Sequence, residues 1–168
     1  MNKAQITSRL LAAGAVLAAA IGGGYLVAPS EGLVNTPYLD PVGIQTVCYG
    51  HTGRDIENRP YSNDECLSML AEDLDAHNRQ MLGYIRAPIT IQQNAAFLSF
   101  CFNVGVSKCS RSTAFKKLNA MDYSGACAEL KRWVYAGGRR LPGLVTRRAN
   151  EYAMCTGQMA DANGWVSL

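Results

Sequence analysis

Two capped helical segments at the centre of the sequence decide its fold class. Residues 62–82 are SNDECLSMLAEDLDAHNRQML and residues 90–105 are TIQQNAAFLSFCFNVG. Each begins with a capping box, SNDE or TIQQ, whose first and fourth side chains satisfy unpaired amides at a helix start. The first segment repeats apolar residues at helical spacing, whereas the second is apolar on nearly every face. We expect a long amphipathic helix followed by a buried central helix that ends at Gly105.

The segments on either side complete an α+β outline. Residues 38–61 are rich in Tyr, Val, Thr and Gly and contain turn-forming pairs, which predicts a small hairpin sheet. Three shorter helices are expected at residues 111–119, 123–136 and 143–156, each ending at or before an Asn or Gly. The predicted architecture is a small β-hairpin lobe that the long helix joins to a mainly helical lobe.

Composition and charge exclude several classes of protein. The chain has 168 residues, a single-domain length. Its 48% hydrophobic and 17% charged residues exclude a disordered tail protein, which cannot bury enough apolar surface to fold. Residues 31–85 hold nine acids against three bases, and residues 86–168 hold eleven bases against four acids. This asymmetry indicates two lobes, one of which faces an anionic polymer or surface.

The first thirty residues are predicted to lie outside this fold. Leu10–Pro29 is LLAAGAVLAAAIGGGYLVAP, which carries no charge and follows Lys3 and Arg9. Such a length spans a bilayer, and the flanking positive charges keep the N-terminus in the cytoplasm. Because eleven of its residues are Ala or Gly, we favour a releasable anchor over a permanent anchor or a signal peptide cleaved after Ala20. All three alternatives export residues 31–168.

Six cysteines agree with export, because an even number of cysteines in a small domain of an oxidising compartment indicates disulfides. The chain has no Cys-x-x-Cys pair and only two histidines, so no metal site is expected. Six cysteines allow fifteen pairings, among which the sequence alone cannot choose. Local spacing favours the last two of the following pairs and elimination leaves the first: Cys48–Cys66, Cys101–Cys109 and Cys127–Cys155.

Two carboxyl groups and a hydroxyl near the start of the exported part form the candidate catalytic site. Asp40 follows Glu31 after eight intervening residues, and Thr46 follows after five more. A protonated carboxyl group can donate to the leaving oxygen of a glycosidic bond, and a carboxylate with a hydroxyl beside it can hold the attacking water. Taken alone, however, the three residues are more typical of a helix end, a turn and a strand.

The residues around this trio resemble the active-site strip of the phage-type lysozymes, glycoside hydrolase family 24. The strip consists of Glu, eight residues, Asp, five residues and Thr, followed by Gly-His, and here it extends from Glu31 to His51. Other similar pieces are Phe102-Asn103-Val104-Gly105, Lys131-Arg132-Trp133 and Gly143-Leu144-Val145-Thr146-Arg147-Arg148. With its Ala/Gly-rich N-terminal segment, the chain is most similar to the signal-arrest-release endolysins of tailed phages.

The resemblance implies an enzyme that cleaves the linkage between N-acetylmuramic acid and N-acetylglucosamine in peptidoglycan and thereby lyses the host cell. Glu31 would be the general acid, while Asp40 and Thr46 would position or activate water, without a cofactor. Two alternatives stay open: a transglycosylase that forms an anhydro product, and an inactive wall-binding protein on the same scaffold. The intact Glu, Asp and Thr spacing argues against the second.

The same resemblance implies a division into a membrane segment, residues 1–30, and a lysozyme-like catalytic domain, residues 31–168. The expected partners are peptidoglycan, the host export machinery, and the inner membrane through residues 10–29. No nucleic acid is expected, because the chain is exported, and the enzyme is expected to be a monomer. It would be held inactive at the host inner membrane and then released to the periplasm.

Supporting roles are expected for two further polar residues. His51 is interpreted as a support of the sheet or of the cleft edge, and Asn103 as a residue that bonds to backbone near the cleft. The pairs Arg139-Arg140 and Arg147-Arg148 are interpreted as solvated surface charges, with attraction to anionic wall polymers or lipid headgroups as the functional alternative.

Overall fold

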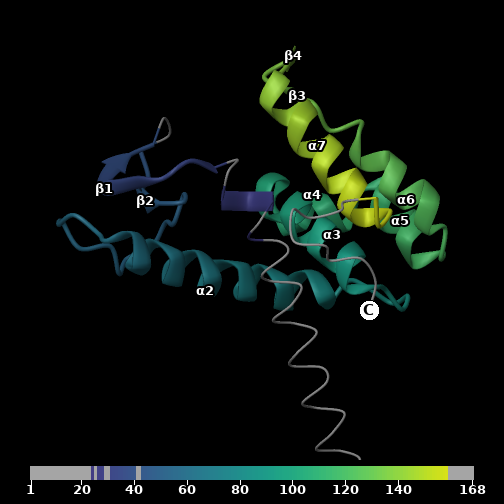
Figure 1. Cartoon of the computed structure of the whole chain (residues 1–168), viewed down its shortest axis with the longest axis horizontal. Coiled ribbons are helices and arrows are strands. Elements are labelled where there is room, and N and C mark those ends of the chain that lie inside the picture. Colours follow the sequence, from purple (N-terminus) through teal and green to yellow (C-terminus); the bar gives the residue numbers. More distant parts are fainter. Residues whose placement is uncertain (1–23, 25, 29–30, 41–42, 159–168) are drawn as a thin grey trace, which may run out of the picture.

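The computed structural model describes residues 24, 26–28, 31–40 and 43–158, so most of the expected membrane segment lies outside the described residues. No helix in the described ranges has the length and hydropathy of a membrane span. The elements in Figure 1 are β1 (Val34–Leu39), β2 (Gln45–Cys48), α2 (Asn63–Leu82), α3 (Ile91–Val104), α4 (Val106–Ser110), α5 (Thr113–Asn119), α6 (Tyr123–Leu130), β3 (Tyr135–Ala136), β4 (Arg139–Arg140) and α7 (Pro142–Cys155).

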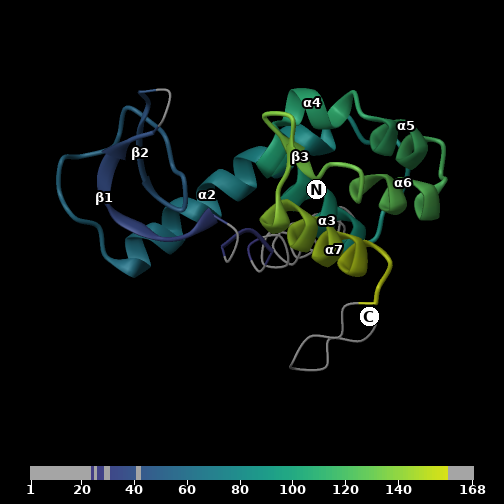
Figure 2. The same cartoon turned by 90° about the horizontal axis from the view of Figure 1, so that it is seen from above.

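The long helix α2 connects two lobes, as the sequence predicts. The antiparallel β1–β2 hairpin lies beside one end of α2, and helices α3 to α7 gather beyond its other end (Figure 1). Seen from above, α3 lies among the other helices, with α7 on one side and α5 and α6 on another (Figure 2). The expectation of a β-hairpin lobe, a connecting helix and a helical lobe is confirmed.

Both capping boxes form and fix where the two central helices begin. Ser62 Oγ accepts from the backbone N–H of Glu65, and the Glu65 carboxylate accepts from the Ser62 N–H, at 3.2 and 2.7 Å. Thr90 and Gln93 exchange the equivalent bonds. The helix α3 ends at Gly105, whose φ of 85° is a conformation that a side chain would strain.

The hydrophobic core is centred on α3, where every residue from 94 to 101 is buried. Phe97 packs edge-on against Phe115 of α5, and Phe100 packs edge-on against Trp133. Helix α7 lies along α3. The α3–α7 contact and the α5–α6 contact are equally extensive and are the largest between helices of the lobe. Val27, from the end of the expected membrane segment, is fully buried in this core.

Three disulfides pair the cysteines as local spacing and elimination favoured. They join β2 to α2, α3 to α4, and α6 to α7. Because all six cysteines are bonded, none is free. The bonds are Cys48–Cys66, Cys101–Cys109 and Cys127–Cys155.

Two expected boundaries are wrong, for reasons of backbone conformation. Helix α6 ends at Leu130 instead of extending to residue 136, and the following chain forms the β3–β4 hairpin. Gly137 and Gly138 make that turn with positive φ. In the β lobe the sheet starts earlier and ends at Cys48, where a positive φ of 61° terminates the strand.

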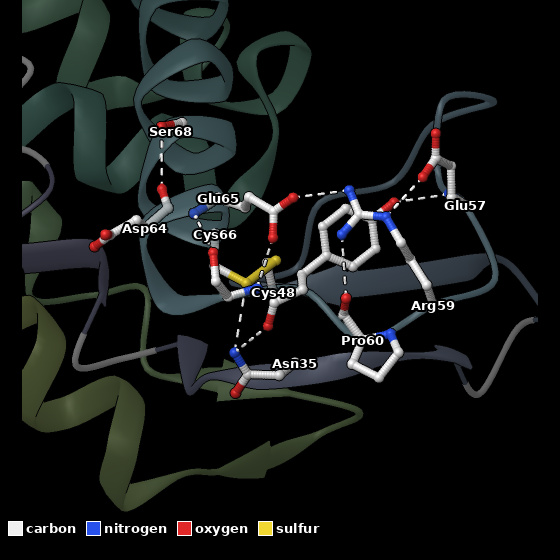
Figure 3. A network of polar contacts seen from close by, with 11 residues as sticks. Asn35, Cys48, Glu57, Arg59, Pro60, Asp64, Glu65, Cys66 and Ser68 are labelled. Atoms are coloured by element: carbon white, nitrogen blue, oxygen red, sulfur yellow. Dashed lines mark hydrogen bonds and ion pairs between the residues drawn. A yellow bond between two sulfur atoms is a disulfide. The ribbon is translucent and has the colours of Figure 1, made fainter.

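An exposed polar network fastens the β lobe to the start of α2 (Figure 3). Arg59 forms ion pairs with Glu57 and Glu65, each at 2.7 Å, and these three residues are called the Arg59 network below. The hydrogen bond from Arg59 is the main reason why the pKa of Glu65 falls to about 2. Asn35 of β1 donates to the carbonyl oxygen of Tyr61 at 2.9 Å, which holds the strand to the chain that enters α2.

Candidate active site

Glu31 lies where the helical N-terminal residues give way to the β lobe. Residues 26–28 and 31 are helical, and β1 begins three residues after Glu31. Glu31 Oε1 accepts a hydrogen bond of 2.5 Å from Nη1 of Arg147 in α7, 116 positions along the chain. The side chain of Glu31 is 26% exposed and that of Arg147 only 4%. A buried cation from the helical lobe therefore orients a carboxyl group that water and a ligand can reach.

Asp40 and Thr46 lie on the β1–β2 hairpin. Thr46 pairs with Tyr38 in the hairpin and is buried, and Asp40 is the first residue after β1. Asp40 Oδ1 accepts from the backbone N–H of Ile44 at 2.8 Å, and Thr46 Oγ1 donates to the Ile44 carbonyl at 3.1 Å. The backbone of Ile44 thus holds both the carboxylate of Asp40 and the hydroxyl of Thr46.

Helix α7 supplies a cluster of buried charges behind Glu31. Arg147, Arg148 and Glu151 are 4%, 1% and 0% exposed, and they are called the α7 cluster below. Glu151 Oε1 accepts from Arg147 Nε at 3.3 Å, from Arg148 Nη2 at 3.0 Å and from Ser99 Oγ at 2.7 Å. Arg147 Nη2 donates to the Ser99 carbonyl, so α3 and α7 share this network.

Burial and charge act in opposite directions on the pKa values of the α7 cluster. Burial raises the pKa of Glu151, although Arg148, Ser99 and Arg147 all stabilise its ionised form. The pKa of Arg148 is lowered to about 10, chiefly by burial. The charge of Arg147 acts in the same direction as burial, while the charges of Glu151 and Glu31 oppose it. Arg148 and Glu31 therefore interact electrostatically.

His51 lies between the β lobe and α2, as a supporting residue would. Its Nδ1 is 2.9 Å from Asp73 of α2 and its Nε2 is 3.3 Å from Asp55. Burial opposes protonation of this imidazole, but the hydrogen bond and charge of Asp73, together with Asp55, raise its pKa. A backbone bridge with Val47 fixes the position of His51 beside β2.

The expectations for Asn103 and for one arginine pair are wrong. Asn103 Oδ1 accepts from Arg148 Nη2 at 3.1 Å instead of bonding to backbone. Arg147-Arg148 is buried, whereas Arg139-Arg140 is exposed as expected. The spacing of Glu151 at three and four positions after the arginines was the available signal, because residues so placed meet on one helix face.

Within the described residues, no group of three or more His, Cys, Asp or Glu side chains could hold a metal ion.

Comparison with known proteins agrees with this arrangement. The phage lysozyme family matches residues 28–151. The chain is 44% identical over 131 residues to the SAR-endolysin of Escherichia phage Mu, covering 78% of this chain and 77% of that protein. It is 41% identical over 152 residues to the SAR-endolysin of Enterobacteria phage P21, covering 83% and 92%. The muramidase domain of SpmX from Asticaccaulis excentricus superposes with a TM-score of 0.73 at 26% identity, covering 79% and 93%.

The chain belongs to the phage lysozyme family, because the family match covers most of its length, from residue 28 to residue 151. The expectation of a muramidase-type glycoside hydrolase is thereby confirmed. Within the family, the similarity to SAR-endolysins confirms the expectation of a phage endolysin that degrades peptidoglycan.

Proposed function

We propose that this endolysin cleaves the glycosidic bond between N-acetylmuramic acid and N-acetylglucosamine with Glu31 as the general acid. The observation that carries the proposal is the hydrogen bond between Glu31 and the buried Arg147, which holds a partly exposed carboxyl group in one orientation. A positioned carboxylic acid donates its proton to the leaving oxygen as the bond breaks. The sugar then develops positive charge at its anomeric carbon.

We assign the attacking water to Asp40 and Thr46. The common attachment of both side chains to the backbone of Ile44 supports this assignment, because a carboxylate can accept the water's proton while a hydroxyl orients the water. Attack from the face opposite the leaving group inverts the configuration at the anomeric carbon. Mass spectrometry of released muropeptides in H₂¹⁸O distinguishes this hydrolysis, which incorporates the label, from transglycosylation, which gives an unlabelled anhydro product.

The decisive experiment is the variant Glu31→Gln. Its amide cannot donate a proton to the leaving oxygen, so turbidity loss of permeabilised Gram-negative cells should fall to background while the circular dichroism spectrum is unchanged. Asp40→Ala and Thr46→Ala should retain more activity, because a water can be held otherwise. Substantial lysis by a folded Glu31→Gln protein would contradict the acid assignment, and full activity of Asp40→Ala would contradict the paired mechanism.

We further propose that the chain is tethered in the host inner membrane through residues 10–29 and is inactive until release into the periplasm. Support comes from the end of that segment, where Leu26 and Val27 are buried and Ala28 packs against the core. A residue cannot occupy the bilayer and the protein core at the same time. In the tethered state the core would lack Val27, and Glu31 would be drawn to the membrane surface, away from Arg147.

Strengthening the apolar segment tests this tether. Replacing Gly14, Gly22 and Gly23 by Leu should retain the protein in the membrane fraction and delay lysis, since each Leu makes transfer out of lipid less favourable. Gly24 is left unchanged, because an added Cβ there would already lie 3.4 Å from Leu74, so that a whole leucine side chain would also change the packing of the released protein. Lysis on the normal schedule, or a mature protein cleaved after Ala20, would refute the proposal.

A further inference from the structure

We infer that Glu151, a fully buried residue, sets the proton affinity of Glu31 through the charge balance of the α7 cluster. The inference rests on the proposed role of Glu31 as general acid. Glu151 is 0% exposed and therefore touches no substrate. It would be a positioning residue, which acts on the reaction only through Arg147 and Arg148.

The need for such a residue follows from the surroundings of Glu31. A general acid must keep its proton until the bond breaks, whereas a neighbouring cation favours the ionised carboxylate. Arg147 contacts Glu31 directly, and Arg148 interacts with it electrostatically. With two uncompensated arginines beside it, Glu31 would lose its proton too readily. An ionised Glu151 reduces the net charge of the cluster from +2 to +1.

The contacts place Arg147 as the bridge between the two carboxyl groups. Its Nη1 donates outward to Glu31, and its Nε donates inward to Glu151. Arg148 adds a second link to Glu151, with Nε 3.0 Å from Oε2 and Nη2 3.0 Å from Oε1. The charge of Glu151 is thus transmitted to Glu31 through guanidinium groups that burial keeps from being screened by water.

No other titratable group in the neighbouring helix can take this role. Helix α3, which packs along α7, contains no acidic or basic residue and contributes only the neutral Ser99 and Asn103 to the network. The other carboxyl group of the site, Asp40, lies on the β1–β2 hairpin. Helix α6, which also packs against α7, carries Glu129, but this carboxylate pairs with Lys117 and Arg132. Among these groups, the carboxylate paired with the two arginines of the α7 cluster is therefore that of Glu151.

A series of variants that changes only the cluster charge tests the inference. Glu151→Gln raises the charge to +2, the double variant Arg148→Met/Glu151→Gln returns it to +1, and Arg148→Met lowers it to 0. The pKa of Glu31 is measured by ¹³C NMR titration of glutamate-labelled protein, with the signal assigned by its loss in Glu31→Gln. The alkaline limb of kcat/KM on purified peptidoglycan gives a second readout, because activity requires protonated Glu31.

The pKa of Glu31 and the alkaline limb should move together with the cluster charge. We expect a shift of about one pH unit per charge, to lower pH in Glu151→Gln and to higher pH in Arg148→Met, with the double variant close to wild type. Ser99→Ala is the matched control, because it removes a hydrogen bond to Glu151 without changing the charge. It should leave the limb nearly unmoved.

Two results would overturn the inference: a Glu31 pKa that is the same in all folded variants, or a double variant that behaves like Glu151→Gln. If Glu151→Gln alone does not fold, the other two variants still test the inference, because the pKa of Glu31 should be higher in Arg148→Met than in the double variant. Failure of the proposed function itself is distinct, because it would appear as lysis by Glu31→Gln, whatever the titration of the series shows.

Discussion

The Arg59 network and the α7 cluster both join arginine to glutamate, but water reaches only the first. In the Arg59 network, seen in Figure 3, the side chains of Arg59, Glu57 and Glu65 are 45%, 68% and 43% exposed. In the α7 cluster no side chain is more than 4% exposed. The same ion pair therefore occurs in one molecule at a high and at a low effective dielectric constant.

The two networks therefore differ in what their ion pairs contribute to stability. Exposed pairs contribute about 0–1 kcal/mol, because solvent screens the attraction and ordering the side chains costs entropy. Buried pairs pay a large desolvation cost, and apolar residues of similar volume are often as stabilising. Stability alone does not explain why α7 carries two arginines and a glutamate inside the lobe. Arg147 also contacts Glu31, which links the cluster to the proposed catalytic acid.

The largest effect is expected from breaking the α7 cluster. Glu151→Ala leaves Arg147 and Arg148 buried without their shared acceptor, so the free energy of unfolding should fall by about 3–5 kcal/mol. Glu57→Ala is the matched control in the Arg59 network and should cost less than about 1 kcal/mol. Urea denaturation followed by circular dichroism measures both. Equal losses in the two variants would show that burial does not distinguish the networks.

Disulfides should not distinguish the two regions, because they act largely through the unfolded chain. Replacing both members of Cys127–Cys155, beside the α7 cluster, or of Cys48–Cys66, beside the Arg59 network, should cost about 2–4 kcal/mol. Their sequence separations of 28 and 18 residues predict costs that differ by less than about 1 kcal/mol. Thermal unfolding of the two double-serine variants checks this. A large difference would mean that local strain or packing outweighs loop closure.

His51 and Asp73 form a pair of intermediate burial, with side chains 13% and 27% exposed. Because the folded pKa of His51 is raised above its ordinary value of 6.5, its stabilisation is complete below that value and is lost as pH rises through the folded pKa. Asp73→Asn should therefore cost about 1–2 kcal/mol at about pH 5 and less at about pH 9. Denaturation at both pH values measures it, and a cost that grows with pH would contradict the pairing.

The smallest effect is expected for Arg59→Ala. The loss of stability should be small at low salt and should shrink further at about 1 M NaCl, where screening acts over about 3 Å. The cost of Glu151→Ala should hardly change over the same range, because salt does not enter the core. If the stability cost of Arg59→Ala did not depend on salt, the contact between the guanidinium and the Tyr61 ring, 4.4 Å away, would matter more than the charge of Arg59.

The parts that the sequence predicts well are those whose physics is local. Capping boxes at residues 62–65 and 90–93 need only four neighbouring residues, and both form. The disulfide Cys101–Cys109 joins positions eight apart. The end of α6 differs from the prediction, because Gly137 and Gly138 turn a hairpin instead of stopping a helix, and α6 ends at Leu130. Local signals mark a turn more reliably than they mark what precedes it.

The sequence by itself was enough to predict the family resemblance from Glu31 to His51, the two-lobe α+β outline and the presence of disulfides. Only the tertiary structure decided that Arg147 and Arg148 are buried and that Arg147 meets Glu31 across 116 positions. From the sequence, two adjacent arginines on a helix are expected to be exposed, because the hydrogen-bond acceptors that compensate for their desolvation lie in other segments. Here the acceptors are the Ser99 carbonyl and the Asn103 side chain of α3, Glu31 at the start of the β lobe, and Glu151 one turn further along α7. Burial of charge is a property of the assembled neighbours, which no single segment encodes.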